Sequence, residues 1–379
     1  MAQPSVLTNA PPKTRRSDFS PLLREVKEAG LLERRTAAYV IAIGINVICL
    51  AAVGAGVAVL GNSWWTLFLA IPFALFTTRA AFFGHDAGHQ QISSSRRVHD
   101  WIQLVHANLL LGMSAGWWND KHNRHHANPN HTDKDPDVGE GVMVWTLTQA
   151  EGRTGLHGWL SRNQAWLFFP LLTLEGLNLK VSGILFLWQR RKTASARREL
   201  GLIAAHHALY FTGLLLVMSP GKAAIFAVIH HMLFGLHLGS VFAPNHKGME
   251  MPDPADTERW GHLEKQVLTS RNVDGGLVTD WMMGGLNYQI EHHLFPNMPR
   301  ANLRYAQPMV KAYCERINLQ YRSVSVGRSY SEALLYLHEV GAELRAEKAI
   351  AAAEKANAVA AKAIARAERV KHSHDKASV

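Results

Sequence analysis

The sequence has only two cysteines, Cys49 and Cys314, among 379 residues. Two distant cysteines provide neither a disulfide framework nor the close pairs of a cysteine-ligated zinc site. The sequence also lacks a glycine-rich dinucleotide-binding fingerprint and any nucleic-acid-binding motif. These absences exclude a fold held together by disulfides and leave no feature that would recognise nucleic acid.

The composition instead indicates a membrane protein. Hydrophobic residues make up 47% of the chain, yet the mean hydropathy is only −0.07, so long apolar stretches are diluted by large polar regions. The formal net charge is +10. Basic residues beside apolar spans more often face anionic lipid than nucleic acid. We therefore expect the lipid bilayer, and no nucleic acid, as a partner.

Crossing the hydrocarbon core of a bilayer takes about 20 apolar residues. Four segments satisfy this requirement and pair as two hairpins, namely 37–60 with 64–83 and 200–218 with 223–242. The hairpin turns carry one lysine, whereas paired arginines flank the other ends, and positive residues accumulate on the cytoplasmic side. The predicted fold class is therefore an all-α integral membrane protein, with four transmembrane helices as two hairpins and a cytoplasmic helical cap.

The two ends of the chain differ from its centre. Residues 1–18 are polar and rich in proline and arginine, and we expect a disordered tail without a secretory signal peptide. Residues 19–36 are predicted to form an amphipathic helix at the membrane interface, ahead of a membrane domain over 37–325. Because alanine is the best helix former, residues 326–379 are predicted to form an alanine-rich, basic helical tail.

Three histidine-rich clusters are the most informative feature of the sequence. They are His85 with His89, then His122 with His125 and His126, and finally Gln289 with His292 and His293. Residues three and four apart share a face of a helix, so the members of each cluster point together. Neutral imidazole is a good ligand for iron, zinc or copper, and seven histidines exceed the four ligands of an ordinary zinc site. Since the charge pattern places all three clusters on one side of the membrane, we predict two metal ions in one cavity, held by the cap.

The order HxxxH, HxxHH, QxxHH resembles the membrane fatty acid desaturase family. Glutamine at the start of the third box is similar to the front-end group and its bacterial relatives, and the segments 242–249 and 284–289 also resemble bacterial members. The resemblance implies an acyl desaturase with two iron ions, and with O2 as co-substrate. It implies these metal ligands: His85, His89, His122, His125, His126, His246, Gln289, His292 and His293.

Further residues are expected around these ligands. Ligating histidines usually donate their other N–H to a carboxylate or a carbonyl. The nearby candidates are Asp86, Asp135, Asp137 and Glu291, with Asn245 as a water-mediated partner. Polar and aromatic residues beside the second and third boxes are expected to line the acyl channel: Trp117, Trp118, Trp281, Met282, Asn287 and Tyr288. The tryptophan pair 117–118 is equally suited to anchoring at the membrane interface.

The implied reaction inserts a cis double bond into a fatty acyl chain, carried as acyl-CoA or as acyl-lipid. Breaking an unactivated C–H bond needs an oxidant that only a cofactor can supply, together with O2 and two external electrons. The sequence lacks the His-Pro-Gly-Gly signature of a fused cytochrome b5 domain. We therefore expect a separate donor, a ferredoxin or similar protein with its reductase, and a location in a bacterial cytoplasmic membrane.

Two alternatives remain open. A related di-iron hydroxylase, ketolase or alkane monooxygenase would use a similar ligand set, although the QxxHH box and the segment 245–249 favour desaturation. A zinc-bearing membrane receptor or a metal transporter is the other alternative. A transporter should place its polar ligands at mid-membrane, whereas these boxes lie at the cytoplasmic ends of the spans.

Overall fold

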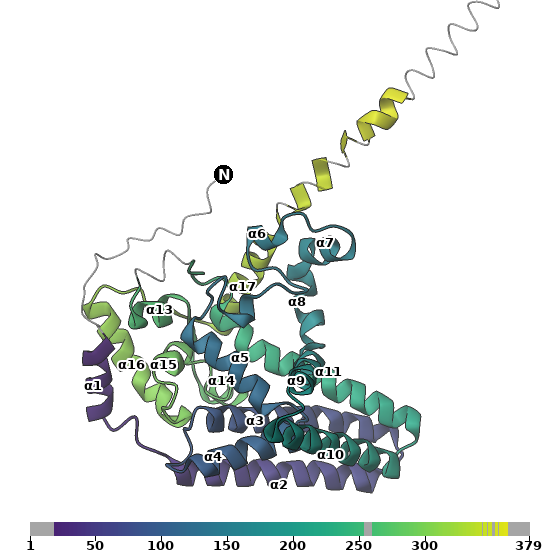
Figure 1. Ribbon diagram of the computed structural model, residues 1–379, viewed down its shortest axis with the longest axis vertical. Coiled ribbons are helices and arrows are strands. Elements are labelled where there is room, and N and C mark those ends of the chain that lie inside the picture. The colour runs from purple at the N-terminus through teal and green to yellow at the C-terminus, as the bar shows by residue number, and fades with distance from the viewer. Residues whose placement is uncertain are drawn as a thin grey trace, which may run out of the picture. The chain divides into compact units, whose positions relative to one another are not determined.

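The computed structural model describes residues 19–253 and 260–342, together with 344–346, 348–350, 353–354 and 356–362 (Figure 1). The predicted tail over 1–18 lies outside these residues, as does the chain from 363 onward. The regular secondary structure of the described residues is almost entirely helical. The exception is a two-stranded parallel sheet of β1 (Asn272–Val273) and β2 (Ser323–Val324). The prediction of an all-α protein is confirmed.

Four helical segments among the described residues are long and apolar enough to cross a membrane. They are α2 (Thr36–Leu60), η1 with α3 (Trp64–Leu69 and Ala70–Gly88), α10 (Ala194–Val217) and α11 (Pro220–His246). Apolar side chains on α2 such as Ile48 and Val59 are 69% and 85% exposed, as expected for a surface that faces lipid. The predicted four spans are confirmed.

The turns of the two hairpins lie together. The backbone N–H of Ser219, at the turn between α10 and α11, donates to Oδ1 of Asn62, at the turn between α2 and η1, over 2.9 Å. Lys222 also bonds the Asn62 carbonyl. Both hairpins therefore open in the same direction, and the opposite ends of the four helices share one side.

The remaining helices of this part of the chain are shorter. They are α1 (Phe19–Glu28), α4 (Arg96–Gln103), the π-helix η2 (Leu104–Leu110), α5 (Ala115–Ala127), η3 (Pro136–Val138), α9 (Glu175–Gln189), α13 (His262–Leu268), α14 (Leu277–Met282), α15 (Gln289–Leu294) and α16 (Arg300–Arg316). Figure 1 shows α13, α15 and α16 gathered at one end of the long helices. This end carries the histidine boxes.

Helix α1 lies within the segment 19–36 that was expected to be amphipathic. Its Leu22 and Val26 are completely buried in a core that includes Leu303 and Ala306 of α16. Burying a side chain of this size contributes about 1.5–3 kcal/mol to stability. The apolar stripe of α1 therefore packs against protein, which fixes the approach to α2.

The chain divides into two compact units, one of 1–139 with 168–333 and a smaller one of 140–167 with 334–379. Helices α6 (Leu147–Ala150) and α7 (Gly155–Arg162) belong to the smaller unit, whose core contains Val144, Ala150, Val340 and Leu344. Helix α8 covers Gln164–Leu172, and α17 covers Val326–Val340. The region 326–379, predicted to be a helical tail, thus begins with a well-packed helix.

Candidate metal centre

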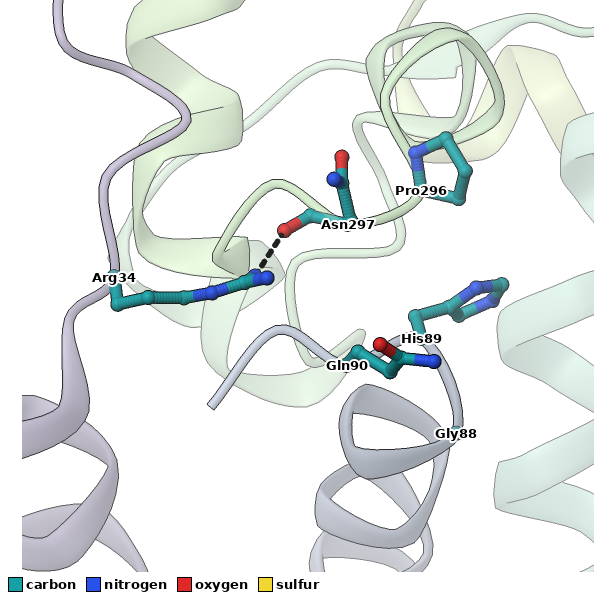
Figure 2. Close-up of a pocket in the computed structure, with 6 residues that line it drawn as sticks. All are labelled: Arg34, Gly88, His89, Gln90, Pro296 and Asn297. Atoms are coloured by element: carbon teal, nitrogen blue, oxygen red, sulfur yellow. Dashed lines mark hydrogen bonds between the residues drawn. The ribbon is translucent and has the colours of Figure 1, made fainter. Parts of the chain in front are cut away.

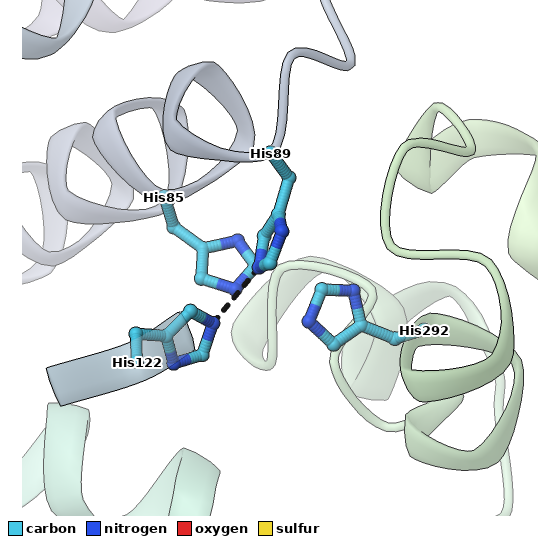
Figure 3. A group of neighbouring side chains, drawn as sticks. All are labelled: His85, His89, His122 and His292. Carbon is cyan, nitrogen blue, oxygen red and sulfur yellow. Dashed lines mark hydrogen bonds between the residues drawn. The ribbon is translucent and has the colours of Figure 1, made fainter. Parts of the chain in front are cut away.

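Residues from four helices converge on one buried site in the larger unit. The histidines form two groups whose nitrogen atoms lie within 4.8 Å of one another in each group. Group one consists of His85, His89, His122 and His292, and group two consists of His125, His246 and His293. Figure 3 shows the group-one rings pointing toward a common centre from α3, α5 and α15. Neighbouring histidines of α5, and of α15, are divided between the two groups.

Group one has the spacing of nitrogens around a metal ion. The Nε2 atoms of His89 and His122 are 2.9 Å apart, and those of His122 and His126 are 3.0 Å apart. Two metal–nitrogen bonds of about 2.1 Å at a right angle place their nitrogens about 3.0 Å apart. The buried Nε2 atoms of His85 and His292 have no hydrogen-bond partner. A bound metal would satisfy these atoms, so the donor set fits one.

Group two has the hydrogen bonds that ligating histidines usually make. In each ring Nδ1 bonds an oxygen acceptor, which leaves Nε2 for a metal. These bonds are His125 to Asp135 (2.9 Å), His246 to the carbonyl of Thr269 (3.0 Å) and His293 to the side chain of Gln266 (2.9 Å). The Nε2 atom of His293 is buried without a partner. Group two therefore fits a second metal ion.

Two further side chains complete the two groups. His126 stacks on His293 with 4.2 Å between ring centroids, so it lies between the groups. The side-chain nitrogen of Gln289 is 3.0 Å from Nε2 of His246, and Asn245 donates to the Gln289 oxygen over 3.2 Å. Rotation of the Gln289 amide by half a turn would present its oxygen to a metal bound by His246.

Burial keeps most of these imidazoles neutral. The pKa values of His89, His122, His126, His292 and His293 lie well below the ordinary 6.5, because burial disfavours the charged ring and neighbouring histidines repel a second proton. Neutral imidazole is the form that binds metal. His125 differs, because burial lowers its pKa but the Asp135 carboxylate more than offsets this and raises it. A proton therefore stays on the nitrogen of His125 that faces Asp135.

The depressed pKa values predict that acid destabilises the metal-free protein. Below pH 6.5 these five histidines bind protons in the unfolded chain but stay neutral in the folded protein. The free energy of unfolding is therefore highest above that pH and falls as pH decreases. Each such histidine lowers the free energy of unfolding by about 1.4 kcal/mol for each pH unit of acidification. The raised pKa values of His125 and Glu291 act in the opposite direction, but they are two groups against five. Thermal unfolding in detergent between pH 8 and 5.5 measures this; an unchanged Tm would contradict it.

Carboxylates orient two of the histidines. Asp86 lies 3.1 Å from Nδ1 of His85 through one oxygen and 3.0 Å from Nε of Arg300 through the other. Asp135 holds His125, and its second oxygen accepts the backbone N–H of Asp137 over 2.9 Å. Asp86 and Asp135 therefore occupy the positions expected of partners to ligating histidines.

Asp137 and Glu291 have other contacts. Asp137 is 3.4 Å from Nδ1 of His125 and pairs with Lys121. Burial alone would raise the pKa of Asp137, but Lys121 and His125 hold it below its ordinary value. Glu291 is completely buried and accepts hydrogen bonds from Asn272 (2.6 Å) and Tyr321 (2.7 Å). Burial raises the Glu291 pKa to about 7. Its contacts tie α15 to β1 and not to an imidazole.

The residues expected to line an acyl channel lie in different surroundings. Trp118 stacks on His122 with 4.1 Å between ring centroids, and Trp117 packs half-buried in the core between α3 and α11.

Trp281 and Met282 end α14 and are 40% and 38% exposed. Arg79 lies over the Trp281 ring, and His237 bonds the Met282 carbonyl over 2.8 Å.

The side chains of Asn287 and Tyr288 both bond Asp280, over 2.9 and 3.2 Å. Among the described residues expected to line the channel, Trp118 is the one whose ring contacts the histidines of group one.

The sequence did not indicate several residues that orient the ligands. Gln266 and Arg300 lie on α13 and α16, far from the boxes along the chain, and the partner of His246 is a backbone carbonyl that any residue type could supply. No residue pattern marks such contacts.

A polar cleft of about 450 Å³ opens beside group one (Figure 2). Its lining consists of Arg34, Gly88, His89, Gln90, Pro296 and Asn297. Arg34 donates to the carbonyl of Asn297 over 2.8 Å and so joins the start of α2 to the loop after α15. His89 and His122 are half-buried, whereas every histidine of group two is buried. Group one is therefore the more accessible of the two.

The fold and the site define a helical membrane protein with two adjoining histidine groups that could hold metal. A family model described as fatty acid desaturase matches residues 62–325. This match covers well over half of the chain, which therefore belongs to the fatty acid desaturase family.

Similar proteins carry desaturase names. The chain is 32% identical over 296 residues to an acyl-lipid (9-3)-desaturase of Physcomitrium patens, covering 74% of this chain and 54% of the relative. It is 29% identical over 326 residues to Delta(8)-fatty-acid desaturase 2 of Arabidopsis thaliana, covering 81% and 71%. It is also 29% identical over 297 residues to Delta(6)-fatty-acid desaturase fat-3 of Caenorhabditis elegans, covering 75% and 67%.

The chain thus spans about half the length of the Physcomitrium relative. All three relatives are eukaryotic, and the expectation of a bacterial membrane gains no support from them.

Proposed function

We propose that this protein is an O2-dependent fatty acyl desaturase that inserts a cis double bond into an acyl chain. The observation that carries the proposal is the convergence of eight histidines into two adjoining groups beside apolar spans, with the family match. In the balanced reaction, a –CH2–CH2– unit, O2, two electrons and two protons give –CH=CH– and two water molecules. Acyl-CoA and acyl-lipid are the candidate substrates, and the name of the Physcomitrium relative favours acyl-lipid.

The two groups would each hold one iron ion. Group one with His126 would bind the first, and group two with Gln289 the second. Bound iron supplies the O2 activation that protein side chains cannot perform. The chain's own part is to orient the rings: Asp86 and Asp135 fix His85 and His125, and the backbone N–H of Asp137 donates to Asp135.

The acyl chain would lie near group one. Trp118, stacked on His122, and its neighbour Trp117 would border it, and Trp281 with Met282 would border its path from the lipid. Asn287 and Tyr288 hold α14 through Asp280 and would act indirectly. Glu291 and Asn245 would support α15 and Gln289 in the same manner.

We also propose that this end of the molecule faces the cytoplasm, where a ferredoxin or similar donor with its reductase would dock. Exposed arginines Arg35, Arg96 and Arg97 lie at this end, opposite the joined hairpin turns. Positive residues favour the cytoplasmic side, and a basic surface attracts an acidic donor. The cleft at His89 brings this surface close to group one.

Lipid analysis of a host that expresses the protein tests the function. We expect a new unsaturated acyl chain, absent from cells expressing a His125→Ala variant made in equal amount. Inverted membrane vesicles supplied with donor, reductase and O2 should form it, whereas sealed right-side-out vesicles should not. A hydroxylated or ketonic product would instead identify the related oxygenases, and purified protein holding zinc without iron would identify the receptor or transporter.

A further inference from the structure

Glu199 is a buried carboxylate near the start of α10, outside the metal centre. It is 5% exposed, and one of its oxygens accepts three hydrogen bonds. The donors are Nδ2 of Asn108 (3.0 Å), Oγ of Ser114 (2.9 Å) and the backbone N–H of Gly116 (3.1 Å). Among the described residues, each ion pair formed by a lysine or an arginine involves a carboxylate other than Glu199. Glu199 is therefore stabilised by hydrogen bonds and not by a cation.

All three donors belong to one connection, the segment from η2 to the first turn of α5. Ser114 is the N-cap of α5 and accepts the N–H of Trp117 over 3.0 Å while its own hydroxyl donates to Glu199. The N–H of Gly116 is one of the donors that a helix start leaves without an intrahelical partner. A negative charge at a helix N-terminus is also stabilised by the helix dipole. Glu199 thus completes the cap of α5.

The start of α5 is held closely against α10. A Cβ atom on Gly116 would lie 2.7 Å from Oε1 of Glu199, so a larger residue here would have to displace the carboxylate. Further along α10, Nδ1 of His206 bonds the carbonyl of Leu109 over 3.0 Å. The connection is therefore fixed to α10 at both of its ends.

Helix α5 carries the three histidines of the second box within three turns of this cap. Trp118, in its first turn, stacks directly on His122 of group one. A change in the position or rotation of the α5 start would move Trp118 and His122 first. His125, further along, is held separately by Asp135. Glu199 thus has its strongest influence on group one.

We infer that Glu199 is a positioning residue that sets α5 so that His122 reaches the group-one metal. The inference rests on the proposed function, because it takes group one to be an iron site. A buried charge costs more than a well-packed apolar side chain of similar size. The carboxylate contributes what an apolar residue lacks, a single acceptor for three donors at one point.

The test compares Glu199→Gln with the matched control Glu315→Gln, whose side chain is exposed on α16. The amide can still accept, but it loses the charge and brings its own N–H groups toward the three donors. Full-length protein is titrated with ferrous 57Fe and followed by bound iron and Mössbauer spectra, with kcat and KM measured separately. We expect about 10–100-fold weaker binding of one iron in Glu199→Gln, an unchanged spectrum for the other, a lower kcat and a KM close to wild type.

A second variant keeps the test decisive if Glu199→Gln folds poorly. Gly116→Ala pushes on the same contact from α5 without changing charge, and should weaken the same iron. In the double variant, the loss of iron-binding free energy should be smaller than the sum of the two single losses, because both substitutions act on one contact. Wild-type iron binding and spectra in Glu199→Gln, or in Gly116→Ala, would overturn the inference. Failure of the proposed function is distinct, because it would appear in the wild-type protein as iron without desaturation, or as no iron at all.

Discussion

Alanine in place of His125 or His292 is expected to abolish desaturation, with at least about a hundredfold loss, because each variant removes one ligand from a different group. Loss of a residue that only supports a ligand typically costs 10–100-fold in metal affinity or activity, so loss of the ligand itself should cost more. His292→Ala should release the group-one iron first, and His125→Ala the group-two iron first. Bound iron per protein and the lipid product are the measurements.

The control for these variants is His157→Ala, which alters an exposed histidine in the smaller unit. It should keep both iron ions and full activity. Wild-type activity in His125→Ala or His292→Ala would remove that residue from the site. If each variant lost both irons together, the two groups would behave as one cluster and the division between them would be wrong.

Gln289→Leu is expected to lose most activity, at least about tenfold, because the substitution leaves the Nε2 of His246 facing a methyl group. Gln289→His keeps a nitrogen donor at this position and should retain more activity and more iron. Because both substitutions are at the same buried position, the difference between them reports whether a polar side chain is needed there. Gln320→Leu, an exposed glutamine, serves as the control. Equal, near-normal activity in both Gln289 variants would place this residue outside the metal centre.

The local parts of the site could be predicted from the sequence. His85 and His89 are four residues apart, and the helix α3 that the apolar run forms brings their ligand nitrogens within 4.8 Å of one another. Spacing of this kind depends only on helix geometry. The four spans were predictable for a similar reason, because their length and apolar character are properties of continuous segments.

Contacts between distant segments could not be predicted. The sequence placed His122 and His125 on one helix face but not in different metal groups, since that division depends on where α11 and α15 approach α5. The same limit applies to Gln266 and Glu199. The ends of the spans also shifted: α11 continues through Pro244 to His246, beyond the predicted residue 242. Pro244 cannot donate to the carbonyl of Ser240 four residues earlier, and the hydroxyl of Tyr330 donates to this carbonyl instead.

The division of α15 between the two groups has a consequence for biosynthesis. Each group takes one histidine from α15, His292 for group one and His293 for group two. On the ribosome, this helix is translated only after all four long helices, so neither proposed iron site is complete until the membrane part has been made. The first two histidine boxes are synthesised much earlier, before the α15 histidines that complete the two groups. A message that stops before Gln289 would direct a protein with all four spans but without a complete set of ligands for either metal.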